Sequence, residues 1–198
     1  PASTFKLVQG MMDLDLKTIN LNTHISCNSS VIKCHYHKNP LNIVGAIANS
    51  CNYFFVYTLQ QMLKPDTPEE TYFKSAHRKF RIWNEYVHKF FFGYQLGVDL
   101  PDEKAGFVPT SGYYDFLYGK KKWNGSMVRS LGIGQGEILA TPLQLANLAA
   151  IFANRGYFIT PHLNKNTIVT QYDLDVDKKN LEIIRRGMRA CITDGNGK

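Results

Sequence analysis

The most informative stretch of the sequence is RSLGIGQGEILATPLQLA, which occupies residues 129–146. Its second half predicts the start of a helix, because Thr141 is a good N-cap residue and Pro142 suits the first helical position. The residues from Leu143 to Ala153 are apolar nearly all round. A helix without a polar face is normally buried, so we expect this one at the centre of a helical layer.

The pattern on either side of this stretch is mainly helical. Downstream, Tyr157–Ile159 predicts a strand and Asn180–Cys191 a last helix. Glycine and proline mark a long loop over residues 93–112. Upstream of it, an amphipathic helix is indicated by apolar residues at helical spacing, namely Ala76, Phe80, Trp83, Val87 and Phe90. The sequence therefore predicts a mixed α+β fold that is largely helical.

The N-terminal segment predicts a helix whose first turn carries a serine and a lysine. Phe5, Val8 and Met12 recur at spacings of three and four residues. Ser3 and Lys6 are then one turn apart and lie on the same face.

A second set of polar residues lies in a predicted break between helices. Residues 17–42 are irregular and polar, which indicates short strands and loop. A short apolar segment over 43–48 leads into Ser50-Cys51-Asn52, and a helical pattern that Pro65 stops follows. We expect Ser50 and Asn52 to be presented to a cleft rather than packed in a core.

These two groups form a Ser-x-x-Lys and a Ser-x-Asn pattern. An unactivated serine hydroxyl is a poor nucleophile, but Lys6 one turn away can act as the base for Ser3 if a desolvated surrounding lowers its pKa. Ser50 and Asn52 can then relay the proton and hold an amide of the substrate. Each motif alone is weak, since a capping serine and a surface lysine are common.

The combination resembles the class B penicillin-binding proteins, the monofunctional transpeptidases, and most closely their elongation-type branch, penicillin-binding protein 2. Ser-x-x-Lys and Ser-x-Asn belong to the motif set of penicillin-binding proteins and β-lactamases. The stretch 129–146 resembles the Ser-x-x-Ile-Gly-Gln-Gly-x-x-x-x-Thr-Pro-Leu-Gln-Leu-Ala segment of that family. Further matching segments are Pro1–Lys6, Ser50–Phe55, Leu100–Glu103 with Gly106, and Asn154–Gly156.

The resemblance implies roles for four residues. Ser3 would be the acylated nucleophile and Lys6 its general base. Ser50 would shuttle the proton to the leaving amine, and Asn52 would bind the substrate amide. The backbone N–H of Ser3 would supply half of an oxyanion hole. For Gln135 and Gln144, within the marker stretch, we expect structural roles in loop and helix packing.

The implied reaction is peptidoglycan cross-linking during cell-wall elongation. Ser3 would attack the penultimate D-Ala carbonyl of a D-alanyl-D-alanine stem peptide, and the acyl group would pass to an amine on a neighbouring strand. β-Lactams would acylate Ser3 covalently as mimics of that substrate, and no cofactor is implied. The family implies a location at the periplasmic face of the bacterial inner membrane, with a glycosyltransferase and elongation-complex proteins as partners through regions outside this sequence.

One family motif is missing. No Lys-Thr-Gly or Lys-Ser-Gly occurs, and Asp194–Gly197 resembles the turn before it, so Lys198 is not its lysine. We expect residues 1–198 to be a partial transpeptidase domain without the strand that anchors the substrate carboxylate, inactive alone. The resemblance places a membrane anchor and a pedestal domain before Pro1.

A cluster of cysteine and histidine residues supports a metal hypothesis. Cys27, Cys34, His35 and His37 lie within eleven residues, and two thiols with two imidazoles suit tetrahedral Zn²⁺. Their spacing fits no common zinc module. A disulfide between Cys27 and Cys34, and unlinked loop residues, are the alternatives.

Charge raises a nucleic-acid hypothesis that the pattern disfavours. The sequence has 23 basic and 16 acidic side chains, a net charge of +7. The basic residues Lys74, Arg78, Lys79 and Lys89 fall mostly off the aromatic stripe of their helix. A stacking platform for bases needs both kinds of residue on one exposed face, so a solvated helix face is the better interpretation.

Two further hypotheses share the serine motif. A non-catalytic β-lactam sensor or pseudoenzyme scaffold would keep the fold without turnover. A serine β-lactamase would share Ser-x-x-Lys but is not expected to carry the stretch from Gly134 to Ala146.

Overall fold

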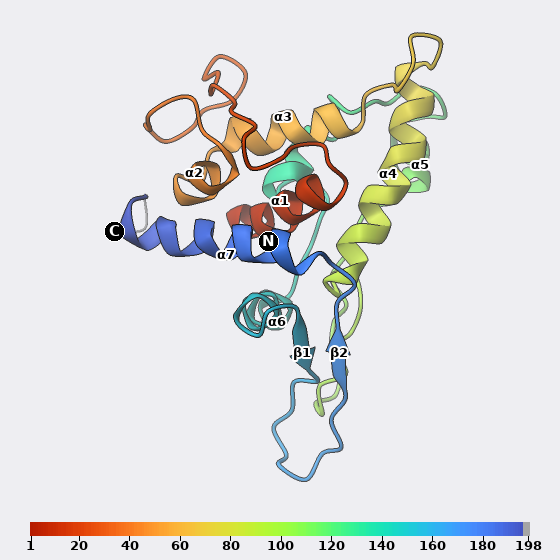
Figure 1. Ribbon diagram of the computed structural model, residues 1–198. Coiled ribbons are helices and arrows are strands. Elements are labelled where there is room, and N and C mark those ends of the chain that lie inside the picture. The colour runs from red at the N-terminus through yellow and green to blue at the C-terminus, as the bar shows by residue number, and fades with distance from the viewer. Residues whose placement is uncertain (196–198) are drawn as a thin grey trace.

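The computed structural model describes residues 1–195, and its elements are mostly helices (Figure 1). The α-helices are α1 (Lys6–Asp15), α2 (Ile43–Ala48), α3 (Asn52–Met62), α4 (Tyr72–Lys89), α5 (Ser111–Tyr118), α6 (Pro142–Ala153) and α7 (Lys178–Thr193). Two 3₁₀ helices are η1 (Ala2–Phe5) and η2 (Arg129–Ile133). Strands β1 (Tyr157–Ile159) and β2 (Gln171–Asp173) pair antiparallel, with Phe158 opposite Tyr172. The predicted mixed α+β class with a predominantly helical part is confirmed.

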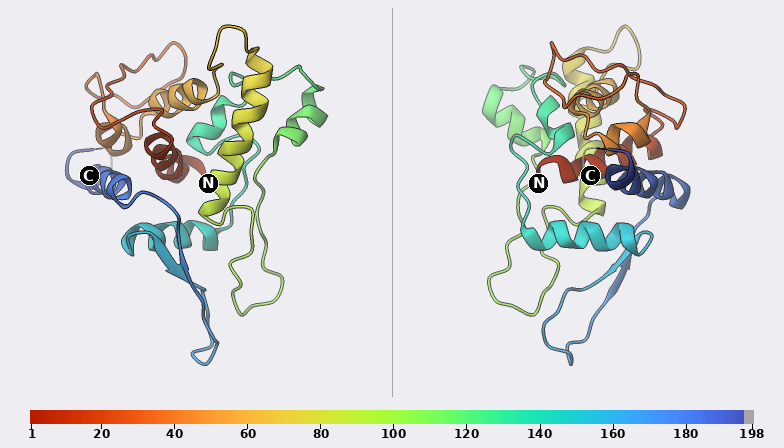
Figure 2. Two further views of the ribbon diagram at one scale, coloured as in Figure 1. Left: turned by 45° about the vertical axis from the view of Figure 1, so that its right-hand side comes forward. Right: turned by 90° about the vertical axis from the view of Figure 1, so that its left-hand side faces the viewer.

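Helix α1 runs through the middle of the helical part. It contacts α2, α3, α4 and α7, which surround it in both views (Figures 1 and 2). Because it is enclosed on all sides, it buries polar residues as well as apolar ones, including Lys6, Gln9 and Asp13. The chemistry carried by this helix therefore operates in a desolvated setting.

Helix α4 buries the aromatic stripe that its spacing predicts. Phe80 and Trp83 are fully buried, and their rings stack at a centroid separation of 4.9 Å. The basic residues of the helix point to acidic partners instead: Arg78 and Lys79 each lie 2.6 Å from Asp66. The aromatic and basic side chains thus lie on opposite faces, as expected for a solvated helix surface.

The segment between α1 and α2 contains less strand than the sequence predicts. Within residues 17–42 the described backbone pairing of strand type is a single bridge between Ile25 and Leu41. The expected short strands are therefore wrong. Asparagine and serine side chains here bond to nearby backbone groups, such as Asn28 to the N–H of Ser30, which competes with strand pairing.

Helix α6 begins as predicted but does not lie at the centre of a layer. Thr141 and Gln144 form a reciprocal capping box, with Pro142 in the first turn. The helix lies beside β1 at the edge of the helical part (Figure 1). Its residues Ala146 and Ala149 are exposed. The prediction of a central helix is wrong because alanine counts as apolar but costs little when it faces water.

Two elements carry no clear sequence signal. Helix α5 begins within the last two residues of the predicted loop. It is capped by Thr110, whose side chain accepts from the backbone N–H of Tyr113. Strand β2 is exposed along its length, so it lacks the alternation of buried and exposed residues that marks a strand.

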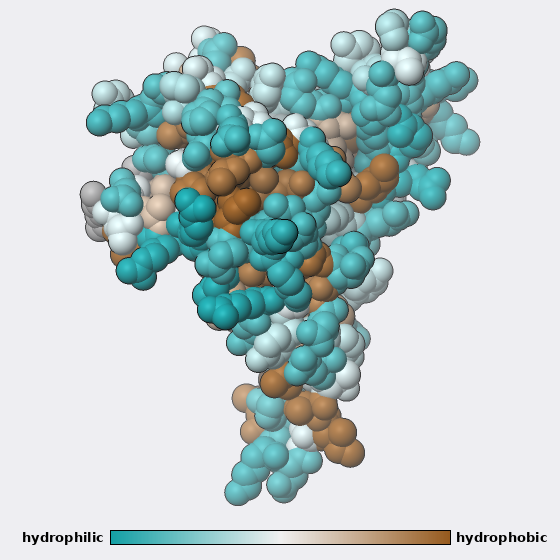
Figure 3. Space-filling model, in the orientation of Figure 1, coloured by the Kyte–Doolittle hydropathy of each residue, from teal (hydrophilic) through white to brown (hydrophobic). Residues whose placement is uncertain are grey.

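The surface in the view of Figure 3 is largely hydrophilic, with apolar side chains gathered near the centre and on the β1–β2 hairpin below the helices. On the connection between the two strands, Leu163 is 72% exposed and Ile168 96% exposed. No helix among residues 1–195 has both the length and the apolar character needed to cross a membrane.

Candidate active site

Ser3 and Lys6 lie on consecutive turns at the start of the chain. Ser3 is exposed on η1, and Lys6 is the first residue of α1. The backbone N–H of Lys6 donates to the Ser3 carbonyl, so a single tight turn separates them, as the spacing predicts. Within the described part of the chain the Ser3 hydroxyl makes no hydrogen bond, which leaves its oxygen accessible.

The side chain of Lys6 is buried and ends on the second motif. Only 2% of the residue is exposed. Its ammonium group donates to the Ser50 carbonyl at 2.7 Å, the Ser50 hydroxyl at 2.8 Å and the Asn52 Oδ1 at 2.7 Å. The structure thus brings Lys6 together with Ser50 and Asn52, which are more than 40 residues away in sequence.

The Ser50–Asn52 segment is the predicted break between two helices. Ser50 follows α2 with a left-handed φ of 50°, and Asn52 opens α3. A left-handed backbone is unfavourable for a serine, so the surrounding contacts must hold it. This turn allows both the carbonyl and the hydroxyl of Ser50 to face Lys6.

Burial changes the acid–base behaviour of Lys6. Desolvation lowers the pKa of its ammonium group from 10.5 to about 8, while the Cys51 and Cys34 thiols oppose the shift. Near neutral pH a useful fraction of the side chain is then the free amine. Such an amine can accept a proton from a hydroxyl one turn away.

The carboxamide of Asn52 is oriented from two sides. Its Oδ1 accepts from Lys6, and its Nδ2 donates to the Lys33 carbonyl at 2.9 Å. Lys33 belongs to the irregular segment before α2, so that segment contributes directly to the site. Sequence spacing gives no indication of this contact.

The glycine-containing stretch lies directly behind the serine turn. The Ala2 N–H donates to the Gly134 carbonyl at 2.9 Å. A Cβ on Gly134, which has a φ of 69°, would collide with the Ala2 carbonyl oxygen and lie 2.6 Å from the Phe5 Cβ. The glycine is required because η1 and η2 approach with no room for a side chain.

The two glutamines of that stretch differ in their surroundings. Gln144 is buried, and its Nε2 lies within hydrogen-bonding distance of the Phe91, Tyr94 and Ala105 carbonyls. Its predicted role in packing is confirmed. Gln135 is exposed, and its backbone N–H donates to the Ser130 carbonyl.

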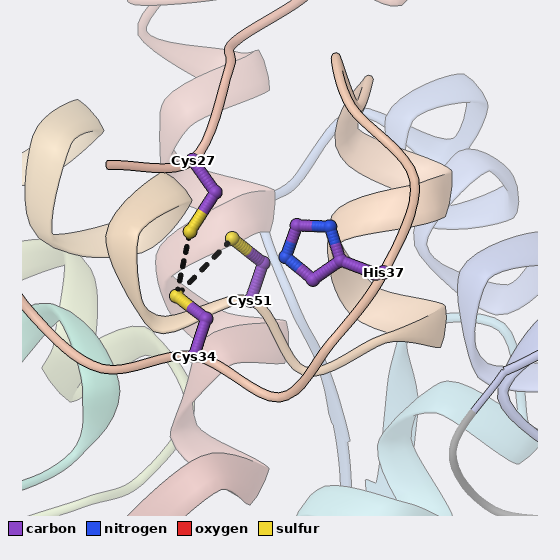
Figure 4. A group of neighbouring side chains, drawn as sticks. All are labelled: Cys27, Cys34, His37 and Cys51. Atoms are coloured by element: carbon purple, nitrogen blue, oxygen red, sulfur yellow. Dashed lines mark hydrogen bonds between the residues drawn. The ribbon is translucent and has the colours of Figure 1, made fainter. Parts of the chain in front are cut away.

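The cysteine and histidine cluster has a different membership from the predicted one. Cys27, Cys34, His37 and Cys51 place one ligand atom each within 4.8 Å of all the others (Figure 4). His35 is exposed and outside this group, so its inclusion is wrong. Cys51 takes its place because the chain folds the Ser-x-Asn motif back onto the loop. The four side chains could hold a tetrahedral metal ion.

The cysteines are free thiols in the structure. The Cys27 thiol donates to the Cys34 sulfur at 2.9 Å, and the sulfurs of Cys34 and Cys51 are 3.8 Å apart. Burial is the largest cause that raises the pKa of the Cys27 and Cys51 thiols above the ordinary value, and the neighbouring Cys34 thiol adds to it. The thiols of Cys27 and Cys51 are therefore favoured in the neutral form.

Asp194 follows α7, and the predicted turn through Gly197 and the assignment of Lys198 lie outside the described residues.

Comparison with known proteins gives a family match along the whole chain. A profile described as the penicillin-binding protein transpeptidase domain matches residues 1–198. The peptidoglycan D,D-transpeptidase MrdA of Acinetobacter baumannii is 39% identical over 127 residues, which cover 64% of this chain and 16% of that protein. The chain therefore spans about a sixth of that relative.

Solved structures agree in fold. Penicillin-binding protein 2 (PBP2) from Helicobacter pylori has a TM-score of 0.77 at 25% identity, covering 98% of this chain and 35% of the other. A complex between PBP2 and MreC from the same organism gives a TM-score of 0.75 at 25% identity, covering 96% and 34%. On these grounds the chain belongs to the penicillin-binding protein transpeptidase domain family and is of the PBP2, or MrdA, type.

Proposed function

We propose that this chain is part of the transpeptidase domain of a peptidoglycan D,D-transpeptidase that works through an acyl-enzyme on Ser3. The observation that carries the proposal is the buried Lys6, held by Ser50 and Asn52 one turn after an exposed serine. An isolated capping serine and surface lysine would leave the lysine in water. Here the lysine is desolvated and joined to the second motif, as a general base requires.

In the first half-reaction the Ser3 Oγ attacks the penultimate D-Ala carbonyl of a stem peptide. Its proton passes to the free amine of Lys6, and the carbonyl oxygen becomes an oxyanion. Ser3 lies in the first turn of η1, where backbone N–H groups have no partner within the helix, so its own N–H can donate to that oxyanion.

Collapse of the intermediate breaks the peptide C–N bond. Lys6 returns the proton through the Ser50 hydroxyl to the leaving D-Ala amine, a path that the 2.8 Å contact allows. The product is an ester between the donor peptide and Ser3. An amine of a second strand then attacks this ester, loses its proton by the reverse path, and releases Ser3.

The substrate amide would be held by Asn52. The oxygen of its carboxamide accepts a hydrogen bond from Lys6, and the nitrogen donates one to the Lys33 carbonyl. Each group retains further hydrogen-bonding capacity, since an amide oxygen has two lone pairs and the nitrogen two hydrogens. β-Lactams would acylate Ser3 in the same way, through attack of its hydroxyl oxygen with Lys6 as the base.

For the whole protein we propose a place at the periplasmic face of the bacterial inner membrane, with the rest of the transpeptidase domain completing the site. The name of one similar structure describes PBP2 bound to MreC. By analogy, we propose an MreC-like protein and a peptidoglycan glycosyltransferase as partners through regions outside residues 1–198.

The test is covalent labelling of the full-length protein with a fluorescent penicillin. Ser3→Ala is expected to abolish labelling, because it removes the hydroxyl that lies one turn before Lys6. Thr4→Ala is the matched control: Thr4 is a neighbouring exposed hydroxyl already bonded to the Pro1 carbonyl at 2.6 Å, so labelling should persist.

Undiminished labelling of Ser3→Ala would reject the nucleophile assignment. Rapid release of hydrolysed drug would favour a β-lactamase. Stable labelling with no cross-linking of stem peptides in vitro would favour the non-catalytic sensor.

A further inference from the structure

Helix α3 carries a polar and aromatic stripe along the face that is turned away from the core. Tyr53, Tyr57 and Gln60 follow one another at spacings of four and three residues, so they lie on one side of the helix. All three are half-buried, whereas Phe55 and Leu59 on the other side are fully buried. The stripe therefore forms part of the surface.

The two tyrosines of the stripe form an aromatic pair. The rings of Tyr53 and Tyr57 stack with their centroids 5.8 Å apart and their planes 24° from parallel. Neither hydroxyl makes a hydrogen bond to another described residue. Each side chain thus offers an apolar ring together with a free polar tip, a combination that is common at binding surfaces.

The stripe leads into a hollow of about 440 Å³ beside the second half of α3. Its walls are α3, the start of α4 and the connection between α5 and η2, which passes the C-terminal end of α3 (Figure 1). Tyr57, Gln60, Tyr72 and Ser126 are among the side chains that line it. The Gln60 Nε2 donates to the Ser126 Oγ at 3.3 Å and so joins the helix to the connection.

The lining of this hollow is polar but almost uncharged. Among the described residues that line it, Lys64 is the one with a charge, and its ammonium group donates to the Gln61 side chain at 2.9 Å. The Oε1 of Gln60 and the Nδ2 of Asn124 make no hydrogen bond within the described chain. These groups are therefore free to bond to a ligand.

A second hollow, between α4 and α5, shows how a charged lining differs. Its lining includes Lys74, Arg81, Lys120 and Lys121, so it suits an anion. The hollow beside α3 instead suits a neutral molecule that has apolar faces and many hydroxyl and amide groups. N-acetylated sugars have this chemistry, because their C–H faces stack on aromatic rings and their hydroxyl and acetamido groups bond to amides and hydroxyls.

The stripe begins at the proposed active site. Asn52, which opens α3 and bonds to Lys6, directly precedes Tyr53. At a rise of about 1.5 Å per residue, Gln60 lies about 12 Å further along the helix axis than Asn52. A polymer that places a peptide at Asn52 can therefore lay the chain that bears this peptide along α3.

We propose that the stripe and the hollow beside α3 bind the glycan chain of peptidoglycan and lead its stem peptide to the proposed active site. Tyr57 and Tyr72 stack on sugar rings. Gln60, Asn124 and Ser126 hydrogen-bond to hydroxyl and acetamido groups. The carbohydrate site stands on the stripe and the hollow, and its assignment to peptidoglycan rests on the proposed function.

The first measurement is calorimetric titration of the full-length protein with glycan strands of alternating N-acetylglucosamine and N-acetylmuramic acid, free of stem peptides. We expect Tyr57→Ala to weaken binding at least about tenfold, as loss of an aromatic anchor does. Tyr57→Phe should bind normally, because it keeps the ring that stacks. Phe116→Ala is the matched control, since Phe116 is 89% exposed on α5 and does not line the hollow.

A second variant guards against a folding defect in Tyr57→Ala. Ser126 is exposed, so Ser126→Leu fills the hollow without disturbing the core, and it should weaken binding as well. Circular dichroism checks that each variant is folded. Glycan binding at full affinity by both Tyr57→Ala and Ser126→Leu would overturn the proposal.

The wild-type protein provides a further check. A full-length protein that binds no glycan strand would overturn the proposal. Failure of hydroxyl radicals to label Tyr57 and Tyr72 in the absence of glycan would overturn it too, since another part of the protein or a partner would then cover the hollow.

The second measurement separates substrate binding from the chemistry at Ser3. A fluorescent penicillin carries no glycan, so Tyr57→Ala should be labelled at the wild-type rate. With uncross-linked peptidoglycan strands as substrate, we expect the KM of this variant to rise about tenfold while kcat is unchanged. Equal slowing of penicillin labelling and of cross-linking would reject a role confined to the glycan.

Unchanged cross-linking by Tyr57→Ala, in a protein that penicillin still labels, would reject the glycan site and leave the proposed function intact. A wild-type protein that binds glycan strands but that no penicillin labels would instead reject the proposed function. The two failures are therefore distinguishable.

Discussion

At the scale of single residues, Lys6 sets the acid–base properties of the site. Burial favours the free amine, whereas the nearby Cys51 and Cys34 thiols favour the ammonium group. The balance leaves its pKa at about 8, within reach of neutral pH. The Ser-x-x-Lys spacing predicts that Ser3 and Lys6 are neighbours, but it carries no information about this burial.

We predict that acylation of the full-length protein by a β-lactam accelerates as the pH rises from 6 to 9, with a midpoint near the Lys6 pKa of about 8. Below that pKa the side chain already holds a proton and cannot accept another from Ser3. The measurement is the second-order acylation rate constant across this range. A flat profile in a protein that remains folded would contradict the role of Lys6 as the base.

Replacing the lysine tests the same role independently of pH. Lys6→Arg keeps a cation but cannot deprotonate, because the guanidinium pKa exceeds about 12. We expect acylation to slow about 10²- to 10⁴-fold, the usual contribution of a general base. Lys79→Arg is the control, since Lys79 pairs with Asp66 on the surface of α4. Comparable slowing in both variants would indicate a general loss of folding instead.

At the scale of elements, the glycine-containing stretch acts as the support for the serine turn. Gly134 lies against Ala2 and Phe5, and Gly132 lies against the Phe55 carbonyl of α3, where an added Cβ would approach to 2.5 Å. The stretch thus joins η1, which carries Ser3, to α3, which Asn52 opens. This packing explains physically why small residues stand at these positions.

We predict that Gly134→Ala lowers the free energy of unfolding by about 1–3 kcal/mol and slows acylation of Ser3. The substitution places a Cβ in a left-handed conformation and against the Ala2 backbone, so η1 must move. Gly112→Ala is the matched control, because its Cβ meets nothing closer than 3.7 Å on α5. Denaturant unfolding and penicillin labelling of both variants give the comparison, and equal effects would argue against the support role.

Helix α6 shows how an element can be predicted well in extent and poorly in placement. Thr141 and Pro142 act locally, so its start follows from the sequence. Its burial depends on which other elements cover it, and alanines such as Ala146 and Ala149 tolerate either environment. Composition therefore could not decide between the centre of a layer and its edge.

At the scale of the whole molecule, enclosure of α1 makes stability depend on pH through Asp13. The residue is fully buried, Gln9 donates to its Oδ1 at 2.9 Å, and its Oδ2 has no partner among the described residues. Burial raises the pKa of this carboxyl from 3.8 to about 7. Between these values the unfolded chain loses its proton while the folded chain keeps it, so stability falls as the pH rises from about 4 to about 7.

We predict that Asp13→Asn stabilises the protein at pH 8 by about 1–3 kcal/mol and has little effect at pH 4, because the amide removes the cost of a buried charge. The oxygen of the introduced amide would still accept from Gln9. Thermal or denaturant unfolding at both pH values checks this, with the exposed Asp173→Asn as control. A stabilisation equal at pH 4 and pH 8 would contradict the assignment.

The sequence by itself determined the local features and the family. The spacing of Phe5, Val8 and Met12 places Ser3 and Lys6 on one face, and the break at Ser50–Asn52 follows from the apolar patterns around it. The tertiary structure alone decided that Lys6 is buried against Ser50 and Asn52, which lie 44 and 46 positions further along the sequence. It also decided that Cys51, not His35, completes the thiol cluster. Helix caps and helical spacing depend on a few neighbouring residues, so they can be predicted from the sequence. Contacts across long loops depend on how all the elements pack together.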